Sequence, residues 1–381
     1  MTKGAKRVLI STWGFPPVSG GTSAILYELF RHFPREEIVA VHSIADPPTF
    51  NVPDLGVERS MVVLLGSYKW TLRCMRRLPQ VIIPVIRRRI IQLARKFGVR
   101  RIYAHFPNDC FVIAAWQAAQ TLGLPLTVYL DILWQESGAG NPAMAAKYEH
   151  RVLQAADQRF AITEFAVDYL HQKHGLKFEL IPHVIDAANL PAGLRPLPQD
   201  RPPVVHFSGG IYATMNLDSM VRLAEAASLA KLRPAIDLCT PDLPAPLAER
   251  GLTCRYLSRP EVMQAQSQST LLYLPQAFHS GRPEMIRHNF PTKAMDYVCS
   301  GRPILVHSPP DSYLAFLARR EGFGLVVDRP DAQELAAAID RLAADSSLQQ
   351  ELVARALEFA RKRDSKKWAE RLWSALITGV D

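Results

Sequence analysis

Short apolar runs alternate with helical patterns along almost the whole chain. Val8-Leu9-Ile10 and Ile304-Leu305-Val306 have the length of buried strands. Segments such as 110–122 and 164–174 carry apolar residues at helical spacing instead. Strands that alternate with helices indicate a parallel sheet with helices wound on both faces. The pattern therefore predicts an α/β protein.

The alternation can be written out as expected elements. In the first half we expect strands at 7–11, 38–41, 61–65, 101–106, 126–131, 160–163 and 180–182, with helices at 24–32, 110–122, 143–156 and 164–174. In the second half we expect strands at 204–207, 236–238, 271–274, 304–307 and 324–327, with helices at 217–231, 332–343, 348–362 and 366–377.

A Pro-rich, aperiodic segment at 187–203 interrupts the alternation, which then starts again, and this is typical of a linker. The 381 residues are also too many for one ordinary core. We therefore expect two doubly wound domains, at 1–190 and 200–362, and a last helix at 363–381. Such domains joined by one linker would form a cleft between the carboxyl ends of their strands.

The segment 289–303 is predicted to form one short helix, because both of its ends are marked in the sequence. Pro291 suits the first helical position, and Gly301 suits the left-handed residue just past the end. Thr292 and Lys293 fall in the first turn, where unpaired N–H groups can hold phosphate, and Asp296 shares a face with Lys293. Two interpretations are open: a helix that binds a diphosphate and a ribose, or a surface helix with an ordinary Lys–Asp pair.

The positive charge of the chain is concentrated in one stretch. The net charge is +9, yet residues 67–101 hold eleven Lys and Arg and no acid, and Pro79 and Pro84 argue against one unbroken helix there. A basic, partly amphipathic region favours contact with an anionic membrane surface. The alternatives are a solvated helix whose arginines pair with acids elsewhere, or a nucleic-acid surface, for which no aromatic ladder or motif is present.

Other sequence features narrow the class of protein. No window approaches ~18 uninterrupted apolar residues, and the first residues lack the pattern of a signal peptide. The five cysteines are scattered and form no CxxC pair, which is typical of buried thiols. We therefore expect a cytoplasmic protein.

The loop at 13–22 lies between a strand and a helix and contains Gly20 and Gly21. A Gly-rich loop in this position can bind phosphate or sugar. It lacks both the GxGxxG spacing of a dinucleotide fold and the Lys-Ser/Thr of a P-loop.

Three segments, in this order, resemble family-4 glycosyltransferases of the GT-B fold. The first is 13–17 with Gly20-Gly21, the second is 162–164 followed by 181–186, and the third is 291–303. The third resembles the family's Pro-Ser-Lys-x-x-Glu-Tyr-x-x-x-Gly-x-Pro element. The likeness covers nearly the whole chain. It implies two Rossmann-like domains that face a cleft and a C-terminal helix that crosses back to the N-terminal domain.

The resemblance also implies a function. The expected reaction is transfer of a sugar, with retained anomeric configuration, from a nucleotide-sugar donor to a glycan or lipid-linked acceptor in cell-envelope polysaccharide biosynthesis. The nucleotide-sugar is a substrate, so neither a cofactor nor a metal is expected, and no nucleic-acid partner. With the basic stretch, the resemblance implies a peripheral location on the inner face of a membrane. A GT-B sugar-nucleotide epimerase and a non-catalytic glycosyltransferase-like subunit remain alternatives.

The implied donor site is mainly in the C-terminal domain. The expected donor-binding residues are Gly20, Gly21, Gly209, Gly210, Arg282, Arg287, Thr292, Lys293 and Asp296. Many family members carry a cation after the first strand of this domain, but the turn at 208–212 has none. Lys293, Arg282 or Arg287 is therefore expected to compensate the charge of the diphosphate.

The sequence departs from the family pattern at two other places, one with an acid pair and one with a histidine. The first acid of the family's Glu-x7-Glu pattern falls at His288, and the second is shortened to Asp296. In the N-terminal domain the family's His-Asp is replaced by Leu130-Asp131. We expect Asp131 to face the acceptor hydroxyl as the first catalytic candidate, with His105 as the second; the alternative for His105 is a buried structural histidine.

Overall fold

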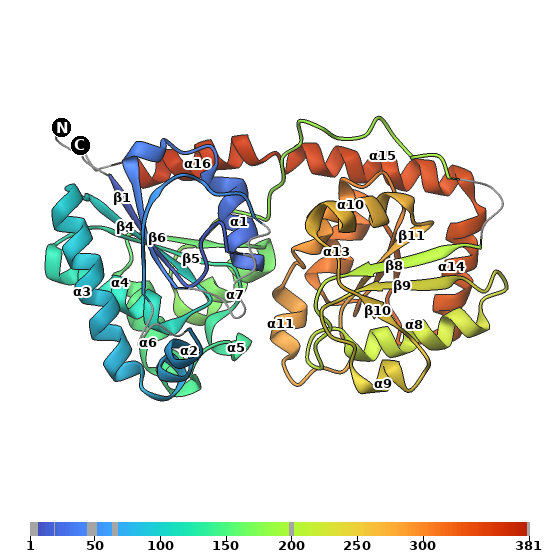
Figure 1. Cartoon of the computed structure of the whole chain (residues 1–381), viewed down its shortest axis with the longest axis horizontal. Helices are drawn as coiled ribbons and strands as arrows, with labels where there is room; N and C mark the ends of the chain where they lie inside the picture. Colours follow the sequence, from blue (N-terminus) through green and yellow to red (C-terminus); the bar gives the residue numbers. More distant parts are fainter. Residues whose placement is uncertain (1–6, 19, 44–51, 63–67, 198–201, 379–381) are drawn as a thin grey trace. The chain divides into compact units, whose positions relative to one another are not determined.

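The computed structural model describes residues 7–18, 20–43, 52–62, 68–197 and 202–378 (Figure 1). The chain divides into two compact units. Unit 1 comprises Met1–Val184 and Ser365–Asp381, and unit 2 comprises Ile185–Asp364.

A parallel sheet forms the centre of unit 1. Its described strands, in sheet order, are β3 (Glu58–Met61), β2 (Ile38–His42), β1 (Val8–Thr12), β4 (Arg101–Phe106), β5 (Leu126–Leu130), β6 (Gln158–Ala161) and β7 (Glu179–Leu180). Every residue of β1, β2, β4 and β5 is buried, as expected for strands covered on both faces. The strand order changes direction between β1 and β4.

Helices cover both faces of this sheet (Figure 1). They are α1 (Gly21–Phe30), α2 (Tyr68–Arg77), α3 (Pro79–Phe97), α4 (Asp109–Leu122), α5 (Trp134–Ser137), α6 (Pro142–Ala155), α7 (Glu164–His174) and α16 (Ser365–Ile377), with a 3₁₀ turn at Arg35–Glu37. The C-terminal α16 belongs to this unit, because Ala369, Leu372 and Leu376 are buried in its core. The ring of Trp373 in α16 lies 4.9 Å from that of Phe33.

Unit 2 repeats the same architecture. The strand order is β10 (Cys254–Arg255), β9 (Ala235–Cys239), β8 (Val204–Ser208), β11 (Leu271–Pro275), β12 (Ile304–His307) and β13 (Leu325–Val327), all parallel. The helices are α8 (Leu217–Leu229), α9 (Ala245–Ala248), α10 (Arg259–Gln268), α11 (Pro283–His288), α12 (Lys293–Val298), α13 (Tyr313–Glu321), α14 (Ala332–Ala344) and α15 (Ser346–Lys362). The predicted α/β class with two doubly wound sheets is confirmed.

Some details differ from the expectations. Leu78 separates α2 from α3 as expected, but α3 runs unbroken through Pro84. Pro84 lacks the N–H that would bond to the carbonyl of Gln80, and both residues are exposed, so that carbonyl can bond to water. The strand expected at 61–65 is β3, which ends at Met61; positions 63–65 lie outside the described residues.

The expected short helix at 289–303 is α12, which begins later and ends earlier than predicted. Thr292 is the N-cap residue, so Pro291 precedes the helix instead of opening it. Gly301 has a φ of 73°, as expected for the left-handed residue after a helix. No helix in the described part of the chain is long and apolar enough to cross a membrane.

Candidate functional site

The turn after β8 is the centre of the candidate donor site in unit 2. The sheet order changes direction between β8 and β11, and ligands of such sheets bind outside the carboxyl ends of the strands at that point. Ser208, Gly209 and Gly210 occupy this position at the end of β8. The topology therefore brings the two predicted glycines to the expected binding edge of the sheet.

Lys293 from α12 lies directly against this turn. A Cβ placed on Gly209, whose φ is 116°, would lie 3.0 Å from Lys293 Cε and 3.3 Å from its Nζ. The ammonium also lies 4.1 Å from the centre of the Phe207 ring, and no acidic partner for it exists among the described residues. Burial lowers the pKa of Lys293 to about 7. The turn without a cation of its own thus receives one from a helix 84 positions further along the chain.

The position of α12 is fixed by a buried contact with the same turn. The Tyr297 hydroxyl accepts a hydrogen bond from the Ser208 N–H at 2.9 Å, and Tyr297 is completely buried. Gln266 Nε2 donates to Ser208 Oγ at 3.0 Å. The strand end and the helix are therefore held together by polar groups that are satisfied away from water.

Asp296, one turn along the same helix, already has a cationic partner. Arg259 Nη2 lies 3.3 Å from Asp296 Oδ1, and both side chains are about one-third exposed. Burial raises the pKa of Asp296, and the nearby Arg259 acts in the opposite direction. A ligand hydroxyl that binds this carboxylate would compete with Arg259.

The two predicted arginines have different surroundings. The Arg287 guanidinium pairs with Glu284 at 2.7 Å and with Asp311 at 2.9 Å, so these acids already neutralise its charge. The backbone N–H of Arg282, the residue before α11, donates to Ser280 Oγ at 3.0 Å. Of the three cations proposed for the diphosphate, Lys293 is the one that the structure shows against the glycine turn.

Thr292 is exposed and precedes α12 without a side-chain capping bond. The helix has only six residues, so its dipole is short and contributes little to anion binding. The sequence argument from the helix N-terminus is therefore weaker than expected, and the lysine is the stronger feature of this segment.

A second cluster in unit 1 brings together both predicted catalytic candidates. His105 Nε2 lies 3.2 Å from Asp131 Oδ2, and the Thr22 hydroxyl donates to the same oxygen at 3.1 Å. On the other side of the imidazole, the Tyr103 hydroxyl lies 3.1 Å from His105 Nδ1. His105 is completely buried and Asp131 is 5% exposed, with no hydrogen-bond partner for Asp131 Oδ1 among the described atoms. Asp131 is therefore the less buried member of the pair, and its Oδ1 is a buried oxygen without a partner among the described atoms.

The Gly-rich loop supplies one side of this cluster. Gly20 is the N-cap of α1 with a φ of 143°, a backbone conformation that favours glycine. Gly21 is the first residue of α1, and Thr22 follows it. The loop thus holds Thr22 against Asp131, although the two residues are 109 positions apart.

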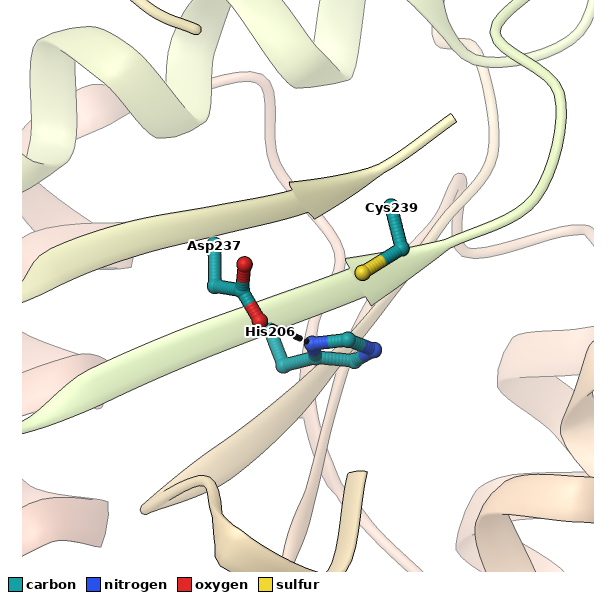
Figure 2. A group of neighbouring side chains, drawn as sticks. All are labelled: His206, Asp237 and Cys239. Atoms are coloured by element: carbon teal, nitrogen blue, oxygen red, sulfur yellow. Dashed lines mark hydrogen bonds and ion pairs between the residues drawn. The ribbon is translucent and has the colours of Figure 1, made fainter. Parts of the chain in front are cut away.

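A third cluster has the side chains of a metal site. Figure 2 shows His206 on β8 with Asp237 and Cys239 on the neighbouring β9, and one ligand atom from each lies within 4.8 Å of the others. His206 Nδ1 lies 2.8 Å from Asp237 Oδ2. Arg255 from β10 donates to both carboxylate oxygens of Asp237, at 2.9 and 2.8 Å.

The charge of this cluster is already balanced. Burial acts to raise the pKa of Asp237, but the hydrogen bonds from His206 and Arg255 outweigh it and lower the pKa to about 2. Burial raises the pKa of the Cys239 thiol, which disfavours the thiolate that a metal would need. The Arg255 guanidinium supplies the positive charge, so these residues fit a hydrogen-bonded network better than a metal site. The sequence did not indicate this cluster, because its residues meet only through strand register.

Comparisons with known proteins agree with the fold. Residues 19–189 match the family model described as Glycosyltransferase Family 4. A search of curated protein sequences found no match. A sucrose-phosphate synthase from Thermosynechococcus elongatus is a similar solved structure, with a TM-score of 0.71, 17% identity, and coverage of 97% of this chain and 98% of that one.

Two further solved structures are similar at the same level. HepE from Anabaena, in complex with UDP and glucose, has a TM-score of 0.69 and 14% identity over 98% of this chain and 99% of that one. A trehalose-phosphate synthase (UDP-forming) from Burkholderia vietnamiensis has a TM-score of 0.63 and 14% identity over 97% and 99%.

The architecture is the GT-B fold of these solved structures. Residues 19–189 are similar to Glycosyltransferase Family 4, the family that the sequence motifs resemble. The resemblance found in the sequence motifs and the predicted GT-B fold are both confirmed.

Proposed function

We propose that this protein transfers a sugar, with retained anomeric configuration, from a nucleotide-sugar to a glycan or a lipid-linked acceptor. The observation that carries the proposal is the Lys293 ammonium against the Gly209 turn, at the switch point of the unit 2 sheet. A partly buried ammonium without an acidic partner is suited to an anionic ligand. The similar HepE structures contain UDP or UDP-glucose, which makes a nucleotide-sugar the first donor to test.

The residues of unit 2 take the donor roles. Lys293 binds the diphosphate and compensates its charge as the bond to the sugar breaks. Asp296 accepts hydrogen bonds from the ribose hydroxyls, and Arg259 is then displaced from the carboxylate. Thr292, which precedes Lys293 in the chain, and Arg282, which precedes α11, are the further candidates for phosphate contacts.

The residues of unit 1 take the acceptor roles. Asp131 accepts a hydrogen bond from the acceptor hydroxyl through Oδ1, the oxygen that neither Thr22 nor His105 contacts. His105 is a positioning residue, since it is buried and faces Asp131 Oδ2. Gly20, beside which a Cβ would meet no atom within 4 Å, leaves room for a sugar, and Gly21 opens α1 just before Thr22.

The first experiment is a thermal-shift screen against UDP, GDP, ADP and their sugar derivatives, because a ligand that binds the native state raises its melting temperature. Transfer is then measured as release of the nucleoside diphosphate on addition of acceptor, and the anomeric configuration of the product by NMR. Interconversion of donor sugars without acceptor would indicate an epimerase. Binding without turnover on any acceptor would indicate a non-catalytic subunit, and no binding at all would refute the donor site.

The surface of α2 and α3 supports contact with an anionic membrane. Four exposed apolar side chains lie on this surface, namely Trp70, Leu78, Val81 and Val85. Val81, Val85, Arg88 and Lys96 are spaced at i, i+4, i+7 and i+15, so they share one face of α3. Exposed apolar groups beside positive charge are the composition of a membrane-surface helix.

Five exposed arginines of this surface have no acidic partner in the described part of the chain. Among the described residues, no ion pair involves the exposed Arg73, Arg76, Arg77, Arg88 or Arg95. This is contrary to the alternative in which distant acids neutralise the stretch. The uncompensated charge favours an anionic surface as the partner, at about 1 kcal/mol for each basic residue near the lipid.

Liposome flotation tests this part of the proposal. The double variant Arg77→Gln/Arg88→Gln should bind anionic vesicles roughly 30-fold more weakly, since two charges contribute about 2 kcal/mol. The matched control Arg250→Gln/Arg361→Gln removes two exposed charges from unit 2 and should leave flotation unchanged. Equal binding to neutral and anionic vesicles would contradict the proposal.

A further inference from the structure

The backbone conformation of Gly210, the second glycine of the turn, does not require glycine. Its φ is not in the positive range, unlike that of its neighbour Gly209. A Cβ on Gly210 would instead collide with the ring of Tyr212, at Cζ and Oη. Glycine is therefore required at this position because the tyrosine ring occupies the space of a side chain.

Tyr212 is held in this place by its backbone. Its N–H donates to Asn216 Oδ1 at 2.8 Å, and Asn216 Nδ2 donates to the Gly210 carbonyl at 3.2 Å. The Tyr212 carbonyl accepts from the N–H groups of Met215, Asn216 and Leu217, each at 3.1 Å. Asn216 is only 4% exposed. These hydrogen bonds hold the backbone of the loop, and the backbone in turn places the Tyr212 ring.

The side chain of Tyr212 is nevertheless largely in solvent. It is 63% exposed, one of the most exposed large hydrophobic residues described. Its hydroxyl has no hydrogen-bond partner among the described residues. An exposed aromatic ring on a fixed loop, with a free hydroxyl, is arranged for contact with a ligand.

The two glycines therefore have the same structural role, since each leaves space for a side chain from another residue. The space beside Gly209 is filled by the Lys293 ammonium, and the space beside Gly210 is filled by the Tyr212 phenol. Consecutive residues of the turn thus carry a cation and a hydroxyl donor from other parts of unit 2. Gly209 and Gly210 were predicted to bind the donor, and these two side chains lie beside them.

We propose that Tyr212 contacts the donor, with its hydroxyl hydrogen-bonded to the diphosphate beside Lys293. The inference rests on the proposed donor site and deepens it. The hydroxyl donates to a phosphate oxygen and supplies part of the stabilisation that a second cation would give. The ring covers the phosphates on the side of Gly210.

The test compares binding of UDP, UMP and uridine to the full chain by calorimetry. If GDP or ADP gives the largest thermal shift with the wild-type protein, the corresponding nucleotide series is used. Tyr212→Phe keeps the ring and removes only the hydroxyl, so it should weaken diphosphate binding by about tenfold, as expected for a hydrogen bond to a charged group. Binding of the nucleoside should stay within twofold. A loss that is equal for nucleoside and diphosphate would indicate a structural role and would overturn the inference.

A second pair of variants tests the spatial argument. Gly210→Arg should weaken diphosphate binding, since the new side chain collides with Tyr212. Gly210→Arg/Tyr212→Ala removes the collision and supplies a guanidinium, so its affinity should return to within about threefold of the wild type. A double variant as weak as the single one would count against the inference.

The outcomes separate this inference from the donor site on which it rests. If the wild-type protein binds no nucleoside diphosphate, the donor site is wrong and the role of Tyr212 falls with it. If the wild type binds and Lys293→Met does not, while Tyr212→Phe binds as the wild type does, only the role of Tyr212 is refuted. Tyr148→Phe, which removes the hydroxyl of a partly exposed tyrosine in α6 of unit 1, is the matched control.

Discussion

Replacing Lys293 by Met should make the protein more stable and its donor binding weaker. Burial lowers the pKa of this ammonium from 10.5 to about 7, and that difference corresponds to ~5 kcal/mol unfavourable to the folded state at low pH. The side chain is partly exposed, so the charged form retains some hydration and the full figure is an upper bound. We expect Lys293→Met to raise the free energy of unfolding by roughly 1–3 kcal/mol at pH 7.

The pH dependence of stability is an independent test of this effect of Lys293. Between pH 7 and 10.5 the unfolded chain binds a proton at Lys293 that the folded protein has released, so wild-type stability rises with pH. Below pH 7 both states are protonated and the unfavourable contribution is complete. The stability advantage of Lys293→Met should therefore be largest at or below pH 7 and should vanish as the pH approaches 10.5.

Donor binding should change in the opposite direction. A hydrogen bond between an ammonium and a phosphate contributes about 1.5–3 kcal/mol, so UDP affinity should fall by roughly 10- to 150-fold in Lys293→Met. In the wild type, UDP binding restores the proton to Lys293. Affinity should therefore decrease above pH 7, by up to about tenfold per pH unit, with proton uptake on binding.

Urea denaturation at pH 7 and pH 10 measures the change in unfolding free energy. Calorimetry in buffers of different ionisation enthalpy measures UDP affinity and proton uptake. Lys231→Met removes an exposed lysine of unit 2 and should change neither quantity. A variant that is destabilised at pH 7, with UDP affinity equal to that of the wild type, would refute the reasoning on both counts.

Three further predictions concern single residues, and one concerns metal. Asp131→Asn should reduce transfer by about 10²-fold or more in a turnover assay and leave UDP affinity within twofold, whereas a proportional loss of both would argue against an acceptor-side role. Gly301→Ala should lower the unfolding free energy by at least ~1 kcal/mol in urea, because φ is 73° and the new Cβ would lie 3.0 Å from Arg195 Cγ. Tyr297→Phe should cost about 1–3 kcal/mol in the same assay, since it leaves the buried Ser208 N–H without a partner; an unchanged midpoint would show that water replaces the hydroxyl. EDTA should leave transfer unchanged, and loss of activity that added Mg²⁺ restores would contradict the expected metal independence.

The sequence alone was sufficient for the fold and for several of its elements. Most buried strands are short apolar runs and the longer helices have their own periodicity, so local pattern identifies elements such as β4, α4 and α7 within one or two residues. The left-handed Gly301 was also predictable, because a helix that ends before Gly and Pro leaves few alternatives. The three motifs that carry the family resemblance are likewise local.

Weakly patterned segments were less predictable. β10 has only two residues and both are exposed, so it has no apolar run to detect. Pro84 was expected to break α3, but hydrophobic burial of Ile82, Ile83 and Ile86 holds the helix together on the opposite face. Local propensity is overridden here by tertiary packing.

The composition of the candidate sites was decided only by the tertiary structure. Lys293 contacts the Gly209 turn because β8 and α12 are neighbours in unit 2. The Arg287 guanidinium is paired because Asp311 lies beside it. His105 and Asp131 were predicted from the sequence and Thr22 was not, because the contact among the three depends on how β4, β5 and α1 pack together. Side-chain chemistry and local periodicity are properties of short segments. Distances between segments follow from strand order and register, which the whole chain decides.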